Sequence, residues 1–324
     1  MDETLIAQVR RFNRTVTERV GALNDRFLGR GRPIGEARLL WEIGEEGRDV
    51  RQLRAQLGLD SGYLSRLLRS LLADGLVTVE PLPRDKRVRT VRLTTAGQEE
   101  REALDRNSNE LAASLLEPLT EAQRDRLVSA MGEVDRLLTA SMVSVAATDP
   151  ETPEAQYCMQ EYFAELGRRF DSGFDPVRSI PADPDELRPP AGLLLVAHLH
   201  TQPVGCGALK FRGDEPTEIK RMWVAPSARG LGLGRRLLTE LEAHAARHGR
   251  SRVLRLETNG ALTEAIGLYR SAGYAEADAF NDEPYAHHWF EKRVTPEPSA
   301  GIRPGTGRPV RAVGTPAGPR RSGR

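Results

Sequence analysis

The spacing of apolar residues changes near the middle of the chain, and this change limits the folds that the chain can adopt. Across residues 3–143 the apolar residues recur at helical spacing, and only residues 76–94 form two β-branched runs, which predicts helices with a single hairpin. The periodicity breaks at residues 145–153, where turn-forming residues gather. Strand-like and helical runs then follow in mixed order, which predicts an α+β sheet. We therefore expect two domains of different class joined by a linker.

The expected domains cover residues 1–147 and 148–295, followed by a tail at residues 296–324. Helices are expected in the first domain at residues 3–28, 35–44, 49–58, 60–75, 95–116 and 120–143. In the second domain helices are expected at 153–170, 230–248 and 261–272, and strands at 192–200, 203–211, 218–224, 252–258, 274–280 and 285–294. The tail is rich in Pro, Gly and Arg with few apolar residues, so we expect it to be disordered.

Composition excludes several classes of protein. The 324 residues suffice for two domains, and 39% hydrophobic with 29% charged residues is typical of a soluble globular chain. No apolar run approaches the roughly 20 residues of a membrane helix, and the N-terminus lacks a signal-peptide pattern. Cys158 and Cys206 are the only cysteines. We therefore expect a cytoplasmic protein without a membrane anchor, a disulfide framework or a metal site.

Residues 49–58 and 60–75 are two short helical segments joined by a tight corner, which predicts a helix-turn-helix. The second segment directs Leu64, Leu67, Leu68, Leu71 and Leu72 inward. Its outward residues suit contact with a DNA groove and are Ser61, Gly62, Tyr63, Ser65, Arg66 and Arg69. The following hairpin carries Arg84, Lys86 and Arg87 at its tip, where a wing would meet DNA. Residues 48–92 hold ten basic and five acidic residues. The alternative interpretation is a solvated face of a helical interaction module.

This order of elements, with Asp85-Lys86-Arg87 in the hairpin and Leu93-Thr94-Thr95-Ala96-Gly97 after it, resembles the MarR family of transcription regulators. The resemblance covers residues 5–140. It implies a mainly α winged helix-turn-helix domain with Ser61, Ser65, Arg66 and Arg69 on the recognition helix and Arg87 on the wing. It also implies a homodimer joined through residues 3–23 and 120–143.

A glycine-rich loop, Arg229-Gly230-Leu231-Gly232-Leu233-Gly234-Arg235-Arg236, lies between an expected strand and an expected helix. Backbone amides left free at a helix N-terminus bind anions, so we expect a phosphate-bearing ligand at this loop. A dinucleotide-binding loop is disfavoured because the glycine spacing differs and two strands precede the loop. A P-loop is disfavoured because no Gly-Lys-Ser/Thr ends it.

The loop and its flanks, EIKRMWVAPSARGLGLGRRLL and NGALTEAIGLYRSAGY, resemble the GNAT superfamily of acetyltransferases over residues 150–294. The resemblance implies an α+β fold with a mixed, mostly antiparallel central sheet, and acetyl-CoA as co-substrate. The cofactor-binding residues would be Met222, Trp223, Val224, Arg229, Gly230, Leu231, Gly232, Leu233, Gly234, Arg235 and Asn259. Glu218 matches the general base of some members, and Tyr269 matches the acid that protonates the leaving thiolate.

Each of these site residues has a structural alternative. Glu218 could pair with Lys220 or another cation, and Tyr269 could be an ordinary half-buried aromatic residue. We expect His287 and His288 to pack on the sheet and Cys206 to be a small core residue. The whole predicts a homodimeric, DNA-binding regulator that acetylates an amine by direct transfer, and the amine has no readable motif. The alternatives are a regulator that only senses acetyl-CoA, or an acetyltransferase whose winged helix only dimerises.

Overall fold

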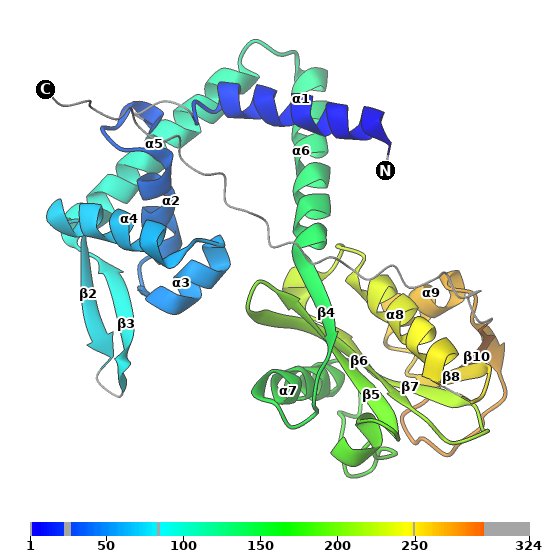
Figure 1. The fold of residues 1–324 in the computed structure, drawn as a ribbon. Helices are drawn as coiled ribbons and strands as arrows, with labels where there is room; N and C mark the ends of the chain where they lie inside the picture. The colour runs from blue at the N-terminus through cyan, green and yellow to red at the C-terminus, as the bar shows by residue number, and fades with distance from the viewer. Residues whose placement is uncertain (1, 23–26, 83–84, 249, 295–324) are drawn as a thin grey trace, which may run out of the picture.

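The computed structural model describes residues 2–22, 27–82, 85–248 and 250–294, with backbone alone at residues 82 and 85–88. Two separate hydrophobic cores form, one in the helical part and one around the large sheet (Figure 1). In the described residues, no helix combines the length and apolar character needed to cross a membrane.

The helical part contains six helices in the described residues and a three-stranded sheet of order β1-β3-β2. The helices are α1 (Glu3–Arg19), α2 (Ile34–Ile43), α3 (Val50–Leu57), α4 (Ser61–Ala73), α5 (Thr95–Leu116) and α6 (Glu121–Met142). The strands are β1 (Arg48–Asp49), β2 (Val77–Leu82) and β3 (Asp85–Leu93). Fully buried leucine and isoleucine side chains from α2, α3, α4 and α5 form its core.

Capping residues set the bounds of the helix-turn-helix. The Asp49 carboxylate accepts from Arg51 N at 2.6 Å and begins α3, and Gly58 ends it at φ 61°. Asp60 accepts from Tyr63 N at 2.8 Å and begins α4. Left-handed backbone favours glycine, and side-chain caps satisfy free helix amides. One prediction for α4 is wrong: Leu72, expected to face inward, is 41% exposed.

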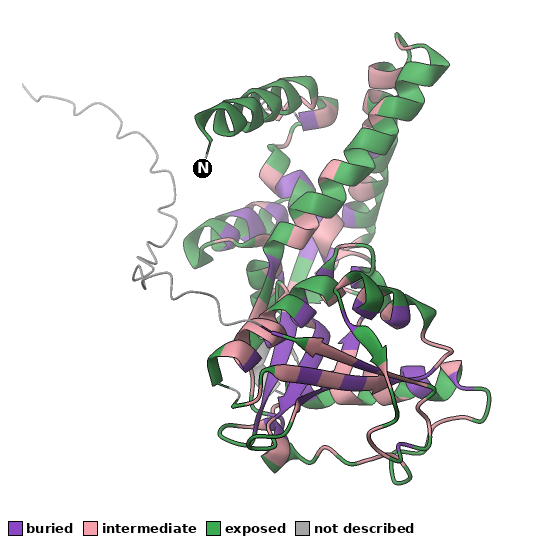
Figure 2. Cartoon of the chain, turned by 90° about the vertical axis from the view of Figure 1, so that its right-hand side faces the viewer, coloured by how far each residue is buried: buried purple, intermediate pink, exposed green. Residues whose placement is uncertain are grey.

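Helices α1 and α6 contribute no residue to either core (Figure 2). Each instead presents a row of large apolar side chains to solvent. On α1 these are Leu5, Ile6, Val9, Phe12 and Val16, and on α6 they are Val128, Met131, Leu137, Leu138 and Met142. Monomeric proteins rarely expose apolar rows of this extent, so both helices have the character of a contact surface.

The joint between the two parts differs from the expected linker. Helix α6 ends at Met142 and strand β4 (Val143–Ala147) begins at the next residue (Figure 1). Strand β4 pairs antiparallel with β5 from Val143↔Leu199 to Ala147↔Leu195. Residues 143–147, expected in the first domain, therefore belong to the large sheet, because their backbone pairs with that of β5. The turn-forming residues follow it.

The large sheet has the order β4-β5-β6-β7-β8-β10-β9, and every pairing is antiparallel except β7 with β8. Its remaining strands are β5 (Gly192–Leu199), β6 (Gln202–Lys210), β7 (Thr217–Val224), β8 (Val253–Thr258), β9 (Ala275–Ala277) and β10 (His288–Arg293). The helices around it are α7 (Pro153–Arg169), α8 (Leu233–His248) and α9 (Thr263–Ser271). The predicted mixed, mostly antiparallel sheet is confirmed, although β9 and β10 are shorter than expected.

Strand β6 shows how helices cover both faces of the sheet. A Cβ on Gly205 would lie 3.3 Å from Leu233 and Leu237 of α8, and one on Gly207 would lie 2.9 Å from Leu241. Side chains alternate along a strand, so Cys206 faces the other side, where its thiol lies beside Cys158 of α7. The glycines let α8 approach closely, and Cys206 is confirmed as a buried core residue.

Candidate functional site

The parallel strands β7 and β8 separate along their length and leave room for two adjoining cavities. In the described chain they pair only at Thr217↔Leu254 and Glu218↔Arg255. Beyond this point β7 is lined on one side by β6, while the side toward β8 is free. The first cavity measures about 470 Å³ and the second about 90 Å³. Both are lined by Tyr162, Leu166, Met222, Leu262, Ala265 and Tyr269.

The glycine-rich loop forms one end of the first cavity. Gly230 and Gly232 have φ of 79° and 73°, where L side chains are strained, and nothing lies within 4 Å of a Cβ on either. Helix α8 begins directly after them at Leu233. Free amides of the first helical turn therefore face an open space, which is the arrangement that binds phosphate oxygens.

The arginine that begins the loop is held by a carboxylate that the sequence did not reveal. Arg229 donates to Glu165 Oε1 at 2.6 Å and to Val224 O at 3.2 Å. Glu165 of α7 is only 8% exposed and also accepts from Trp223 Nε1 at 3.0 Å. One carboxylate thus joins the loop to the end of β7 and to α7. No local motif marks Glu165, because its partners lie about 60 residues away in sequence.

Most of the residues expected at the cofactor do line the first cavity. They are Met222, Trp223, Val224, Arg229, Gly230, Gly232, Leu233, Gly234 and Arg235. Leu231 lies outside the lining and packs on the hydrophobic core. Asn259 lines the second cavity, where its side chain donates to Tyr285 O at 2.7 Å and accepts from Ala261 N at 2.8 Å. Its contact with the cofactor arm stays a prediction.

Tyr269 of α9 lies where the two cavities meet. It is 5% exposed and packs against Tyr274 and Phe290, with ring centroids 6.0 Å away in both cases. Burial raises the pKa of its phenol well above the ordinary value, and the negative charge of Glu257 adds to the increase. The phenol therefore keeps its proton at neutral pH, at a position that lines both cavities.

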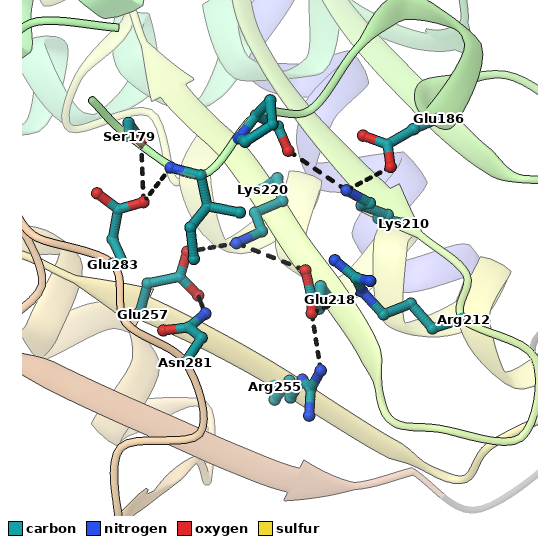
Figure 3. A network of polar contacts seen from close by, with 12 residues as sticks. Ser179, Glu186, Lys210, Arg212, Glu218, Lys220, Arg255, Glu257, Asn281 and Glu283 are labelled. Carbon is teal, nitrogen blue, oxygen red and sulfur yellow. Dashed lines mark hydrogen bonds and ion pairs between the residues drawn. The ribbon is translucent and has the colours of Figure 1, made fainter. Parts of the chain in front are cut away.

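Glu218 lies outside both cavities, contrary to its expected role as base. Its buried carboxylate contacts Arg255 at 2.8 Å, Arg212 at 2.9 Å and Lys220 at 3.5 Å (Figure 3). Burial alone would raise the pKa of Glu218, but these three cations outweigh it and hold the pKa below the ordinary value. A carboxylate in this setting fastens β7 to β8, so the structural alternative describes it better.

Glu257, near the end of β8, lines the second cavity, which Glu218 does not. Lys220 forms an ion pair with its Oε1, and Asn281 donates to its Oε2 at 3.4 Å (Figure 3). The charge of Glu257 contributes to the raised pKa of both Tyr162 and Tyr269, after burial in each case. Glu257 is thus close to the two tyrosines that both cavities share. It carries no recognisable motif and follows ordinary strand residues, so sequence reasoning missed it.

Aromatic side chains form the outer wall of the second cavity. Phe170, Phe174 and Tyr285 line it, with ring centroids of Phe174 and Tyr285 4.9 Å apart. Glu283 closes one side and accepts from Ile180 N at 2.7 Å and Ser179 Oγ at 3.0 Å (Figure 3). His287 and His288 do not line either cavity: His287 accepts from Gly260 N, and His288 contacts Glu276 at 2.6 Å.

The candidate nucleic-acid interface lies on α4. Its expected outward residues are all exposed, namely Ser61, Gly62, Tyr63, Ser65, Arg66 and Arg69. Tyr63 is the least free of them, because its hydroxyl lies against Gly35 of α2 and Arg66 stacks over its ring at 5.7 Å. Arg84 lies outside the described residues, and the side chains of Lys86 and Arg87 do as well.

Comparison with known proteins identifies both parts of the chain. Residues 156–274 match the acetyltransferase (GNAT) family, and residues 30–88 match the MarR family. An IAA acetyltransferase of Azospirillum brasilense is 40% identical over 144 residues, which are 44% of this chain and 90% of the relative. An uncharacterised N-acetyltransferase of Schizosaccharomyces pombe is 32% identical over 157 residues, covering 47% of this chain and 91% of the relative.

The helical part has a regulator among its relatives. The HTH-type transcriptional repressor IacR of Pseudomonas putida is 31% identical over 91 residues, which are 28% of this chain and 54% of that repressor. The match therefore spans about half the repressor's length. With two cavities beside a glycine-rich loop in one part, the chain belongs to the GNAT family of acetyltransferases, and the helix-turn-helix part in front of it is similar to the MarR family over residues 30–88.

Proposed function

We propose that this protein is a DNA-binding regulator whose GNAT domain transfers an acetyl group from acetyl-CoA to an amine. The observation that carries the proposal is the meeting of two unlike cavities at Tyr269 and Met222. The first offers backbone amides and a free strand edge, which suit a phosphate-bearing, amide-containing arm. The second offers ionisable side chains, which suit an acceptor that must lose a proton.

The groups that line the first cavity suit the phosphates and the amides of CoA. Amides of the Gly230–Gly234 loop and of the first turn of α8 would bind the pyrophosphate, and a side chain at Gly230 or Gly232 would intrude on that space. The free edge of β7 at Met222, Trp223 and Val224 would bind the amides of the pantetheine arm. Arg235 lines the same cavity and adds a positive charge near the phosphates.

The reaction needs a proton acceptor for the amine and a proton donor for the leaving sulfur. We assign the first role to Glu257, directly or through a water, in place of Glu218. The amine nitrogen then forms a bond with the acetyl carbon, the carbon–sulfur bond breaks, and Tyr269 donates its proton to the thiolate. Positioned acids and bases contribute roughly 10²–10⁴-fold each to such rates.

We also propose that the helical part binds DNA as a homodimer. The exposed apolar rows of α1 and α6 support dimerisation through these helices, and the exposed Arg66 and Arg69 on α4 support groove contact. Because β4 pairs within the sheet, we place the division between the domains after Met142.

The acetyltransferase proposal is tested by titrating the protein with acetyl-CoA in a calorimeter and then following thiol release with a panel of amines. The A. brasilense relative is named an IAA acetyltransferase, so IAA joins the panel. Binding with thiol release on one class of acceptor would support the proposal. Binding without release for every acceptor would point to a sensor of acetyl-CoA, and absence of binding would contradict the cavity assignment.

The DNA-binding proposal is tested by the salt dependence of affinity for fragments from the protein's own promoter region. We expect log Kd to rise linearly with log salt, with a slope of about 0.9 per phosphate contacted. Arg69→Ala should reduce affinity, whereas Arg247→Ala, an exposed arginine on α8, should not. A dimer without measurable DNA affinity would favour an acetyltransferase whose winged helix only dimerises.

A further inference from the structure

One arginine at the second cavity is held in a conformation that ordinary strand residues avoid. Arg221 has φ 58°, in the left-handed region, although it is not glycine. The register between β6 and β7 shifts at this point, since Cys206 pairs with Trp223 while Ala208 pairs with Lys220. Such a bulge redirects side chains, and left-handed non-glycine residues concentrate at functional sites.

The bulge brings consecutive side chains to one cavity. In a regular strand neighbouring residues face opposite sides, yet Ile219, Lys220, Arg221 and Met222 all line the second cavity. The Cys206 thiol contacts Arg221 O at 3.2 Å, so the core itself holds the bulge in place. The side chain of Arg221 is thereby directed toward the acceptor space.

The other charged residues of this cavity already have partners. Lys220 pairs with Glu257 and Glu218, and the Glu283 carboxylate accepts hydrogen bonds from Ile180 N and Ser179 Oγ. Arg221 differs: across the described residues no carboxylate forms an ion pair with it. Its guanidinium lies over the rings of Phe163 at 5.0 Å and Tyr162 at 5.7 Å.

The guanidinium of Arg221 also forms a hydrogen bond with Tyr162. Because it carries five N–H donors, an edge stays available. That edge is a planar set of donors that matches a carboxylate in a two-point contact. The small volume of the cavity, about 90 Å³, suits a compact acceptor, and the rings of Phe170, Phe174 and Tyr285 suit its apolar part.

We propose that Arg221 binds a carboxylate of the acceptor, so that the protein acetylates small amines that carry a carboxylate, as amino acids do. This rests on the proposed amine acetylation. Arg221 would hold the carboxylate while Glu257 faces the amine, which sets the orientation of the acceptor. Arg221 is therefore a residue that determines specificity.

The test compares acceptors that differ only in the carboxylate: phenylalanine with phenethylamine, tryptophan with tryptamine, and alanine with ethylamine. Thiol release gives kcat and KM for each. We expect kcat/KM to be about 30-fold higher for the carboxylate member of a pair that fits, because a charge-assisted contact in a cavity commonly has this effect. Equal values within each pair, or a preference for the decarboxylated member or for a lysine peptide, would overturn the inference.

Arg221→Gln should bring kcat/KM of the carboxylate-bearing acceptor down to that of its decarboxylated partner, mainly through KM. The decarboxylated partner and acetyl-CoA affinity should not change. Arg221→Lys should restore part of the loss, because it keeps the charge without the two-point geometry. Arg247→Gln, an exposed arginine that lines neither cavity, is the matched control. Equal losses for both members of a pair would show that Arg221 acts on the fold and not on the carboxylate.

Failure of this inference is separable from failure of the proposed function. If the wild type binds acetyl-CoA but releases no thiol with any amine, the amine-transfer proposal fails. In that case calorimetry with CoA-loaded protein compares 3-phenylpropionate with phenethylamine. Binding of 3-phenylpropionate that Arg221→Gln abolishes would support the carboxylate site, and binding that is absent or insensitive to Arg221→Gln would overturn it.

Discussion

The two cavities of the acetyltransferase part differ in how far backbone groups and side chains contribute to their walls. The first has one end made of backbone, namely a loop with two left-handed glycines, the first turn of α8 and the free edge of β7, and is completed by side chains of α7 and α9. The second is formed by side chains from α7, the segment after it, β7, β8, α9 and the segment before β10. A backbone site tolerates change wherever side chains point away from it. A side-chain site changes its ligand when a single residue changes, so we expect the choice of acceptor to depend on the second cavity.

Gly232→Glu should have the largest effect and should act on the first cavity alone. The substitution adds a carboxylate to the anion-binding space at a residue with φ 73°, so acetyl-CoA affinity should fall by about 10³-fold or more. Calorimetry measures it. Gly213→Glu is the matched control, since Gly213 also has positive φ with open space around it but lines neither cavity. Equal losses in both variants would mean that backbone strain, and not the cavity, causes the effect.

Glu218→Gln should affect stability more than turnover. Removing one partner from a buried ionic cluster leaves its cations uncompensated, which costs about 3 kcal/mol of unfolding free energy. The native pKa of Glu218 is lowered, so its stabilising contribution is complete above the ordinary value of 4.5 and is lost as pH falls through the native pKa. Urea unfolding should therefore give a free energy of unfolding for Glu218→Gln well below that of the wild type at pH 7. The difference between the two proteins should be smaller at pH 3. An unchanged stability with a large loss of kcat would restore Glu218 as the base.

Glu257→Gln should produce the opposite pattern. We expect kcat to fall by about 10²-fold because the acceptor amine loses its proton acceptor, while acetyl-CoA affinity stays within about twofold. Steady-state kinetics with a saturating acceptor and calorimetry with acetyl-CoA separate the two quantities. A variant with normal kcat would remove Glu257 from the proposed chemistry.

Tyr269→Phe should have the smallest effect of the four, about a tenfold loss of kcat, since water can partly replace a proton donor to a thiolate. Tyr274→Phe is the control, because Tyr274 is a buried tyrosine that packs against Tyr269 but lines neither cavity. Equal rates for the two variants would contradict the assignment of Tyr269 as the acid.

The same contrast explains what could be predicted from the sequence. The loop glycines, the strand before them and the helix after them are neighbours in the chain, so this end of the first cavity could be predicted, whereas its lining from α7 and α9 was missed apart from Tyr269. Glu165 could not be predicted, because helix α7 brings it to Arg229 and Trp223 only after the sheet has formed. The Leu231 side chain packs on the core, which leaves the predicted contact through its backbone amide as a prediction.

The second cavity depends on strand register, which local pattern does not determine. Glu218 seemed a suitable base, but the alignment of β7 with β8 brings Arg255 to its carboxylate, where Arg255 donates to Oε1. Glu257 and Arg221 reach the cavity through the separation of β7 from β8 and the bulge in β7. In the helical part, caps and the apolar pattern predicted α3 and α4 well. Strand β4 was missed because its pairing partner, β5, lies about 50 residues later.

No linker residue separates α6 from β4, so the helical part joins the acetyltransferase part directly. Each linker residue would add two soft backbone angles, and with none present the strand takes its direction from the end of the helix. Arg236 in the first turns of α8 strengthens this joint by donating to Val143 O at 2.7 Å. We therefore expect a rotation at the far end of α6 to be passed on to the sheet that carries the two cavities.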